Sequence, residues 1–184
     1  MIQKWKRLSS KIVFEHPRLT LMEDEVELPD GSVTQYLRSS SPKSAATAVI
    51  AIKGNKVLLS REYSYPPDEV LYQFPGGAVN FGEKPEVAAR RELIEETGYK
   101  TSSLKLLGWY YIDNRRTDAK MYVFVATDIT PCKREGGDSE EFIESSWVPI
   151  SSISGYIAKG KLPNFSALAA WALYEAKRDS LTTS

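Results

Sequence analysis

The stretch GAVNFGEKPEVAARRELIEETGY, residues 77–99, combines the start and stop signals of a helix with a high density of acidic residues. Pro85 fits the first turn of a helix, and Gly98 fits the position just past its end. The segment between these two residues is long enough for about three helical turns. We therefore expect one well-bounded helix here, with loops on both sides.

The last turn of this expected helix is acidic. Glu92, Glu95 and Glu96 share one face, where close pairs of like charges are destabilising. Two of them also lie at the negative end of the helix dipole, where basic residues are normally preferred. The simplest interpretation is a solvated acidic face partly neutralised by Arg91, four residues before Glu95. A bound cation would also remove both conflicts.

The joint spacing of the charged residues and glycines favours the cation. At average residue usage, seven fixed positions would coincide by chance on the order of once in a hundred million starts. The seven positions are Gly77, Glu83, Arg91, Glu92, Glu95, Glu96 and Gly98. They resemble the signature of the Nudix hydrolases, which usually ends in an aliphatic residue where this chain has Tyr99. We expect Tyr99 to pack in the core.

The resemblance implies a loop-helix-loop that binds Mg²⁺ or Mn²⁺ and cleaves a diphosphate linked to another group. Hard divalent cations prefer oxygen ligands, which suits a cluster of carboxylates and phosphate oxygens. The implied metal ligands are the carbonyl of Gly76 and the carboxylates of Glu92 and Glu96, and Glu95 on the same edge is a further ligand or a base. Arg91 is expected to orient the glutamates through salt bridges. The implied fold is α/β, an α/β/α sandwich with a mixed sheet and a small N-terminal antiparallel β subdomain.

Composition limits the other function classes. The 184 residues are 42% hydrophobic and 26% charged, which is typical of a globular protein with one main domain. The 24 basic and 24 acidic residues balance, so no overall charge favours nucleic acid or an anionic membrane. One cysteine, Cys132, excludes an internal disulfide. With no signal-peptide pattern or membrane span, we expect a cytoplasmic protein.

The order of the remaining segments is rich in strands. We place an N-terminal subdomain at 1–44, ending in a Ser/Pro-rich linker at 39–44, a Nudix domain at 45–178 and a flexible tail at 179–184. Asn164 is expected to cap a last helix that runs to about Lys177, with Leu168, Trp171, Ala172 and Ala176 as its apolar stripe. A shorter helix is expected at 151–159. The expected strands are 19–28, 33–37, 46–52, 57–62, 71–74, 104–112, 121–128 and 144–148.

Several motifs resemble the ADP-ribose pyrophosphatase branch of this family. They are QKWKRLSSKIVF with Trp5, the ELPDG run at 27–31, and LLSREYSYP with Arg61. In that branch the N-terminal strands pack between two subunits and help to hold adenine, which implies a homodimer. Carried over to this chain, the resemblance makes Trp5, then Arg38, candidate substrate-binding residues. Trp5 is as readily explained by packing against its own strands.

Three departures from the branch concern substrate choice. Ser64 stands where the branch commonly has an arginine, and Gln73 where it has a glutamate. Residues 113–118, DNRRTD, replace the usual Ser-Pro-Gly run. Arg61, Arg115 and Arg116 are candidate substrate contacts. Arg115 and Arg116 have the alternative of pairing with the aspartates beside them.

A general base is expected in the acidic loop before the last main-domain strand. The resemblance implies that a glutamate there activates water or helps to bind metal, and the candidates are Glu140 and Glu141. We do not separate these two residues. The alternative is a solvated acidic loop, which Gly136 and the neighbouring basic residues favour for most of its charges.

We therefore expect a Mg²⁺- or Mn²⁺-dependent hydrolase that cleaves the pyrophosphate of a small nucleoside diphosphate-linked metabolite. ADP-ribose or a related ADP-sugar or dinucleotide is the leading substrate, and no nucleic-acid or membrane partner is expected. One alternative is a nucleoside triphosphate pyrophosphohydrolase. Another is a non-catalytic module that binds nucleotide or RNA.

Overall fold

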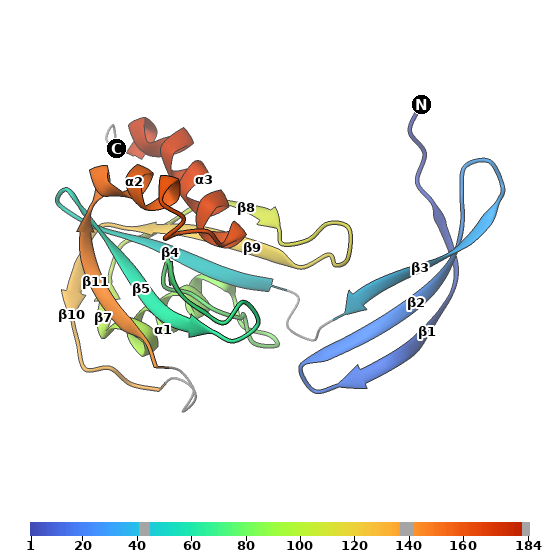
Figure 1. The fold of residues 1–184 in the computed structure, drawn as a ribbon, viewed down its shortest axis with the longest axis horizontal. Coiled ribbons are helices and arrows are strands. Elements are labelled where there is room, and N and C mark those ends of the chain that lie inside the picture. The colour runs from blue at the N-terminus through green and yellow to red at the C-terminus, as the bar shows by residue number, and fades with distance from the viewer. Residues whose placement is uncertain (41–44, 137–141, 182–184) are drawn as a thin grey trace. The chain divides into compact units, whose positions relative to one another are not determined.

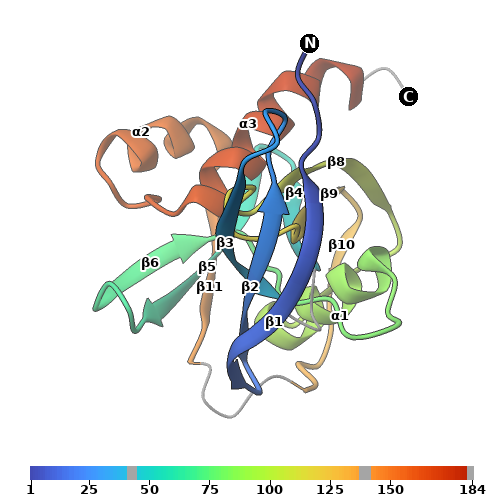
Figure 2. The same cartoon turned by 90° about the vertical axis from the view of Figure 1, so that its right-hand side faces the viewer.

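The chain divides into two compact units, which Figures 1 and 2 show in two views. In this computed structural model the described residues are 1–40, 45–136 and 142–181. One unit comprises Met1–Ser44 and Tyr111–Ala119, and the other comprises Ala45–Tyr110 and Lys120–Ser184. The first unit is therefore discontinuous in sequence.

The first unit is a three-stranded antiparallel sheet. Its strands are β1 (Lys6–His16), β2 (Leu19–Glu27) and β3 (Val33–Ser40), paired in the order β1-β2-β3. Gly31 provides the positive φ of 84° in the turn between β2 and β3. Every residue of β1 is exposed, whereas Asp24 and Val26 of the central strand are buried.

Residues from the middle of the chain complete this unit. The backbone N–H of Ser39 in β3 donates to the carbonyl of Arg116 at 2.7 Å. The hydroxyl of Tyr36 donates to the carbonyl of Arg115 at 2.6 Å. The segment Tyr111–Ala119 thus belongs structurally with the N-terminal strands.

The second unit is built on a mixed six-stranded sheet. The strand order is β11-β5-β4-β9-β8, and β6 pairs with β5. β4 and β9 run parallel, with Ala45 opposite Lys120, whereas β4–β5, β5–β6 and β5–β11 are antiparallel. β7 and β10 form a separate two-stranded sheet. The bounds are β4 (Ala45–Lys53), β5 (Lys56–Ser64), β6 (Glu69–Gln73), β7 (Tyr99–Thr101), β8 (Leu104–Tyr111), β9 (Lys120–Ala126), β10 (Ile129–Pro131) and β11 (Glu144–Pro149).

Helices cover this sheet on both faces, as Figure 1 shows for α1 and α3. Val49 and Ala51 of β4 join the core cluster that contains Leu93 of α1. Ala48, on the opposite face of β4, lines a cavity with Ala167 of α3. The helices are α1 (Pro85–Thr97), the 3₁₀ turn η1 (Ile150–Ser152), α2 (Ile153–Ala158) and α3 (Phe165–Leu181). The expected α/β class, with a mixed sheet and a separate antiparallel N-terminal sheet, is confirmed.

The C-terminal helix corrects two expectations. Asn164 does cap it, accepting the backbone N–H of Ala167 at 2.7 Å, but the helix continues through Leu181 rather than ending near Lys177. Ala172 and Ala176, which were expected in the apolar stripe, are exposed, so this part of the prediction is wrong. Trp171 stacks on Phe74 with ring centroids 6.0 Å apart, which fixes the rotation of the helix. The buried residues are Ala167, Ala170, Trp171 and Tyr174.

Strand boundaries also moved where backbone pairing overrides local composition. β3 extends through Ser40 into the expected 39–44 linker, because it remains paired with β2. The short strands β7 and β10, which pair only with each other, were not expected from the sequence. None of the helices within the described ranges combines the length and the apolar character of a membrane-spanning segment.

Candidate functional site

The signature helix has the boundaries that its sequence predicts. α1 begins with Pro85 in its first position and ends at Thr97, where Gly98 caps it with a φ of 68° and an N–H that donates to the carbonyl of Ile94 at 2.9 Å. Tyr99 packs edge-on against Trp147 beside the core, with ring centroids 5.5 Å apart. The expected core position of Tyr99 is therefore confirmed, and the helix is anchored at both ends.

Arg91 bridges the acidic residues around it. Its Nε donates to Glu83 at 3.0 Å, while its Nη1 donates to Glu92 at 2.8 Å and to Glu95 at 2.9 Å. Its Nη2 donates to the carbonyl of Ala78 at 3.0 Å. The hydrogen bond from Arg91 holds the pKa of Glu83 below its usual value, and the same hydrogen bond raises the pKa of Arg91. One guanidinium thus fixes three carboxylates at the start of the signature and on the helix.

Glu96 has a different environment from the other glutamates. It is 5% exposed, and its carboxylate accepts the backbone N–H of Gly76 and the hydroxyl of Ser60, each at 3.3 Å. Burial raises its pKa to about 8, and the charges of Glu92 and Glu62 add to that effect. Within the described ranges, no basic side chain forms an ion pair with Glu96. A buried carboxylate of this kind favours a proton or a cation.

These observations fit a divalent cation. The donor set is entirely oxygen, and Glu96 lacks the positive partner that Arg91 provides for Glu92 and Glu95. No three acidic, histidine or cysteine side chains among residues 1–40, 45–136 and 142–181 already converge into a closed metal cage. An ion held here would therefore depend on a few carboxylates, backbone oxygen and water, which is the usual environment of Mg²⁺.

The two glycines before the helix bring the loop backbone against these glutamates. A Cβ on Gly76 would lie 2.1 Å from the carbonyl oxygen of Thr47, so this position has no room for a side chain. A Cβ on Gly77 would lie 2.6 Å from Oε1 of Glu92. The backbone N–H of Thr47 also donates to the carbonyl of Gly77 at 2.8 Å. Close packing of this loop between β4 and α1 is what brings Gly76 to Glu96.

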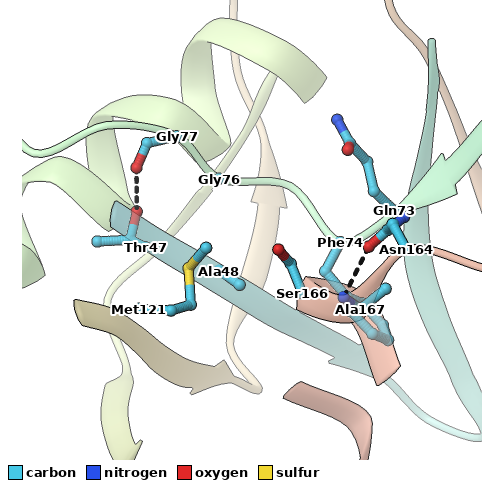
Figure 3. Close-up of a pocket in the computed structure, with 10 residues that line it drawn as sticks. All are labelled: Thr47, Ala48, Gln73, Phe74, Gly76, Gly77, Met121, Asn164, Ser166 and Ala167. Carbon is cyan, nitrogen blue, oxygen red and sulfur yellow. Dashed lines mark hydrogen bonds between the residues drawn. The ribbon is translucent and has the colours of Figure 1, made fainter. Parts of the chain in front are cut away.

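A small cavity of about 100 Å³ lies beside this loop, as Figure 3 shows. One wall is formed by Thr47, Gly76 and Gly77, and another by Ser166 and Ala167 at the start of α3. The glycine loop and the start of the C-terminal helix therefore line the same cavity.

Arg61 lines a larger cavity of about 460 Å³ near the C-terminal end of β5. Its Nη1 is 3.9 Å from the exposed carboxylate of Glu144, which is a weak surface contact. On the same strand, Glu62 accepts the amide N–H of Gln73 at 2.8 Å. Gln73, one of the departures from the branch, therefore holds Glu62 through a hydrogen bond from an uncharged amide.

The acidic loop approaches the signature helix at its described end. Arg134 donates through Nε to the carbonyl of Glu95 and through Nη1 to the carbonyl of Ile143 at 3.4 Å. A Cβ on Gly136 would lie 2.6 Å from Oε1 of Glu95, so the chain passes close to that carboxylate. The candidate bases Glu140 and Glu141 lie outside the described residues.

The other candidate substrate residues belong to the N-terminal unit. Trp5 is 51% exposed and meets Tyr36 edge-on, with ring centroids 5.9 Å apart. Arg38 donates to both carboxylate oxygens of buried Asp24, at 2.6 and 3.3 Å. Within the described residues, neither Arg115 nor Arg116 forms an ion pair with the aspartates beside it. The structure brings Arg38, Arg115 and Arg116 to one cavity of this unit.

Sequence reasoning missed several residues that hold these groups. Ser60 ends the apolar run VLLS, so a polar residue in a buried strand was a usable signal. Asp24 lies in the middle of an expected strand and is buried in the structure. A buried carboxylate normally has a basic partner, so a search for that partner was possible. Arg134 gave no such signal, because its partners are backbone carbonyls of distant residues.

Comparison with known proteins identifies two family domains in the chain. The NUDIX domain model matches residues 42–170, and the model of the nucleoside diphosphate sugar hydrolase N-terminal domain matches residues 5–36. The chain is 28% identical over 159 residues to the "Methanol dehydrogenase activator" of Bacillus methanolicus, covering 85% of each chain. It is 29% identical over 141 residues to the "ADP-ribose pyrophosphatase" of Bacillus subtilis, covering 76% of this chain and 75% of that relative.

A solved structure shares the whole fold. It is described as "Crystal structure of ADP compounds hydrolase" and superimposes with a TM-score of 0.88 at 24% identity. The match covers 98% of this chain and 97% of that one. The glutamate cluster on α1, the glycine loop against it and the domain match over most of the sequence lead to one conclusion: the chain is an enzyme of the Nudix hydrolase family.

Proposed function

We propose that this enzyme cleaves the pyrophosphate of an ADP-linked metabolite, most simply ADP-ribose, in a reaction that depends on Mg²⁺ or Mn²⁺. The observation that carries the proposal is Glu96, buried against the N–H of Gly76 without a basic partner. Water adds to one phosphorus and the bridging P–O bond breaks, so ADP-ribose gives AMP and ribose 5-phosphate. The names of the relatives, above all "ADP-ribose pyrophosphatase", support this substrate class.

The metal would be held by Glu92, Glu95, Glu96 and the carbonyl of Gly76. A divalent ion bound there would screen the phosphate charge and lower the pKa of a bound water. Arg91 then has a positioning role, because it already holds Glu92 and Glu95 through one guanidinium nitrogen. Its remaining donors fix Glu83 and the loop carbonyl of Ala78.

The general base is proposed to be Glu140 or Glu141. The support comes from the described residues that flank them, since Gly136 lies against Glu95 and Arg134 joins Glu95 to Ile143. A carboxylate from this loop would take the proton of the attacking water. Arg61, beside the cavity at the end of β5, is proposed to contact the substrate.

The N-terminal unit is proposed to take part in substrate binding and in a homodimer. β1 is an edge strand, and it exposes Leu8, Ile12, Val13 and Phe14. Long exposed edges with apolar side chains favour pairing with another chain. Light scattering after size exclusion should give twice the 20.7 kDa chain mass, and Ile12→Glu should shift it to the monomer. A monomeric parent protein would remove this part of the proposal.

The function is tested with a substrate panel. ADP-ribose, NADH, dinucleoside polyphosphates, nucleotide sugars and nucleoside triphosphates are each assayed with Mg²⁺, with Mn²⁺ and with excess chelator. We expect metal-dependent release of AMP from ADP-linked substrates, and no comparable turnover of triphosphates. Turnover in chelator would refute the metal dependence, whereas tight nucleotide binding without turnover would favour a binding module. The cytoplasmic location stays a prediction.

A further inference from the structure

The first unit contains a cavity of about 280 Å³ that is entirely its own. Its walls come from β1, from β3 and from the segment between β8 and β9, and all nine lining residues belong to this unit. Four of the nine are arginines: Arg7, Arg38, Arg115 and Arg116. Such a concentration is unusual in a chain whose 24 basic and 24 acidic residues balance.

The cavity has an excess of positive charge. Asp118 is the one carboxylate among the lining residues. Asp24 does not line the cavity but contacts two of its arginines, Arg7 and Arg38. Asp24 is already committed, because it accepts from Arg38 and from the hydroxyl of Ser10 at 2.5 Å. Four guanidinium groups against these two carboxylates leave a local charge of about +2, which attracts an anion.

The loop that presents two of these arginines is held by backbone bonds. The carbonyl of Asp113 accepts the N–H groups of Arg116 at 3.0 Å and Thr117 at 2.8 Å. The carbonyls of Arg115 and Arg116 in turn accept the Tyr36 hydroxyl and the Ser39 N–H. The backbone is thus fixed without using the guanidinium groups, which lowers the entropy cost of binding a ligand.

The guanidinium donors of the loop are largely unused. Arg116 makes one long hydrogen bond, from Nη1 to the carbonyl of Leu37 at 3.4 Å. Neither loop arginine pairs with a carboxylate within the described parts of the chain. A guanidinium carries five N–H donors in a planar fork that matches phosphate oxygens.

We propose that this cavity is a phosphate-binding site. Its volume is near the lower end of the roughly 300–1,000 Å³ of small-molecule pockets, so it suits a phosphate with at most a sugar-sized group attached. Arg115 and Arg116 grip the phosphate, while Arg7 and Arg38 provide the positive wall. The phosphate is either a free ion or part of the substrate, and only the second case rests on the proposed function.

The direct test is calorimetric titration of inorganic phosphate into the full chain at low salt, with chelator present. Chelator keeps metal-bound phosphate at the signature glutamates out of the measurement. Arg115→Ala should weaken binding about tenfold or more, since a charge-assisted hydrogen bond is lost. Arg115→Lys should recover only part of that loss, because lysine lacks the fork. Arg18→Ala, in the same unit but outside the cavity, is the matched control and should change the affinity less than about twofold.

Equal phosphate affinity in the parent, Arg115→Ala and Arg18→Ala proteins would overturn the proposal, as would no binding at all. Because no turnover is measured, an inactive enzyme leaves this result readable.

Steady-state kinetics then separate the two sources of the phosphate. If it belongs to the substrate, Arg115→Ala raises KM for ADP-ribose with little change in kcat, and inorganic phosphate competes with substrate in the parent protein alone. If it is a free ion, KM is unchanged and phosphate binds equally well beside a non-hydrolysable substrate analogue. Both patterns support the site, provided that the calorimetric loss in Arg115→Ala is observed.

Discussion

The first strand of each unit illustrates how differently the two sheets are stabilised. All eleven residues of β1 are exposed, whereas five of the nine residues of β4 are buried. β4 lies between two helices, and its side chains join a core cluster that includes Leu93. The three-stranded sheet instead has a buried Asp24 paired with Arg38. Apolar packing therefore positions the helix that carries the signature glutamates, whereas in the first unit a hydrogen-bonded charge pair holds Arg38.

The largest expected effect comes from removing the charge of Glu96. Glu96→Gln should lower hydrolytic activity by about 10²–10³-fold, because the proposed metal loses an anionic ligand. The free energy of unfolding without metal should not fall, since burial already disfavours the charged form of this carboxyl. Steady-state assays and urea unfolding measure the two quantities. An active Glu96→Gln protein would contradict the assignment.

Arg91 tests how far the second unit depends on charge as well as on its core. Arg91→Lys should destabilise this unit by roughly 2–4 kcal/mol, because one ammonium cannot bridge three carboxylates and a carbonyl. Arg178→Lys on α3 is the matched control, since Arg178 makes exposed ion pairs, and it should change stability by less than about 0.5 kcal/mol. Equal effects in urea unfolding would mean that the Arg91 contacts add little.

The charge pair of the first unit predicts a pH dependence. The hydrogen bond from Arg38 lowers the pKa of Asp24 below its ordinary value. The pair therefore stabilises the sheet fully above about pH 4, and this contribution disappears as pH falls through the lowered pKa. The gain is modest, roughly 1–2 kcal/mol, because neighbouring side chains of a thin sheet cover Asp24 rather than a deep core.

Hydrogen exchange of the β2 amides can measure this dependence against Asp24→Asn. The parent protein should be better protected at neutral pH, and the difference should shrink toward pH 3. A difference that stays constant with pH would show that the carboxylate charge is not responsible.

The smallest expected effect concerns the corrected face of α3. Ala172→Gln should change the free energy of unfolding by less than about 0.5 kcal/mol, because Ala172 is exposed. Ala170→Gln is its buried counterpart and should be clearly destabilising, since the core has no room for the amide. Similar urea midpoints for the two variants would indicate that Ala172 is buried like Ala170.

Local signals in the sequence were sufficient for α1, because Pro85, Gly98 and the acidic spacing lie within one short segment. The same holds for Asn164, whose capping role depends on its own helix. The rotation of α3 was not predictable in this way, since it follows from Trp171 stacking on the distant Phe74.

The support around the candidate site was equally non-local. Ser60 reaches Glu96 across 36 positions, and Arg134 reaches the carbonyl of Glu95 across 39. The candidate catalytic residues could therefore be predicted from the sequence, whereas the distant residues that hydrogen-bond to them could not.

The discontinuous first unit has a consequence for biosynthesis. Its sheet is made first, but the segment Tyr111–Ala119, whose backbone bonds to β3, is translated only after Ala45–Tyr110 of the second unit. At roughly 5–20 residues per second, the N-terminal strands wait several seconds for this partner. During that interval Tyr36 and Ser39 of β3 lack the carbonyls of Arg115 and Arg116 that they bond in the finished unit. The nascent chain is therefore most exposed to chaperones, or to a neighbouring copy on the same messenger, before Ala119 leaves the ribosome.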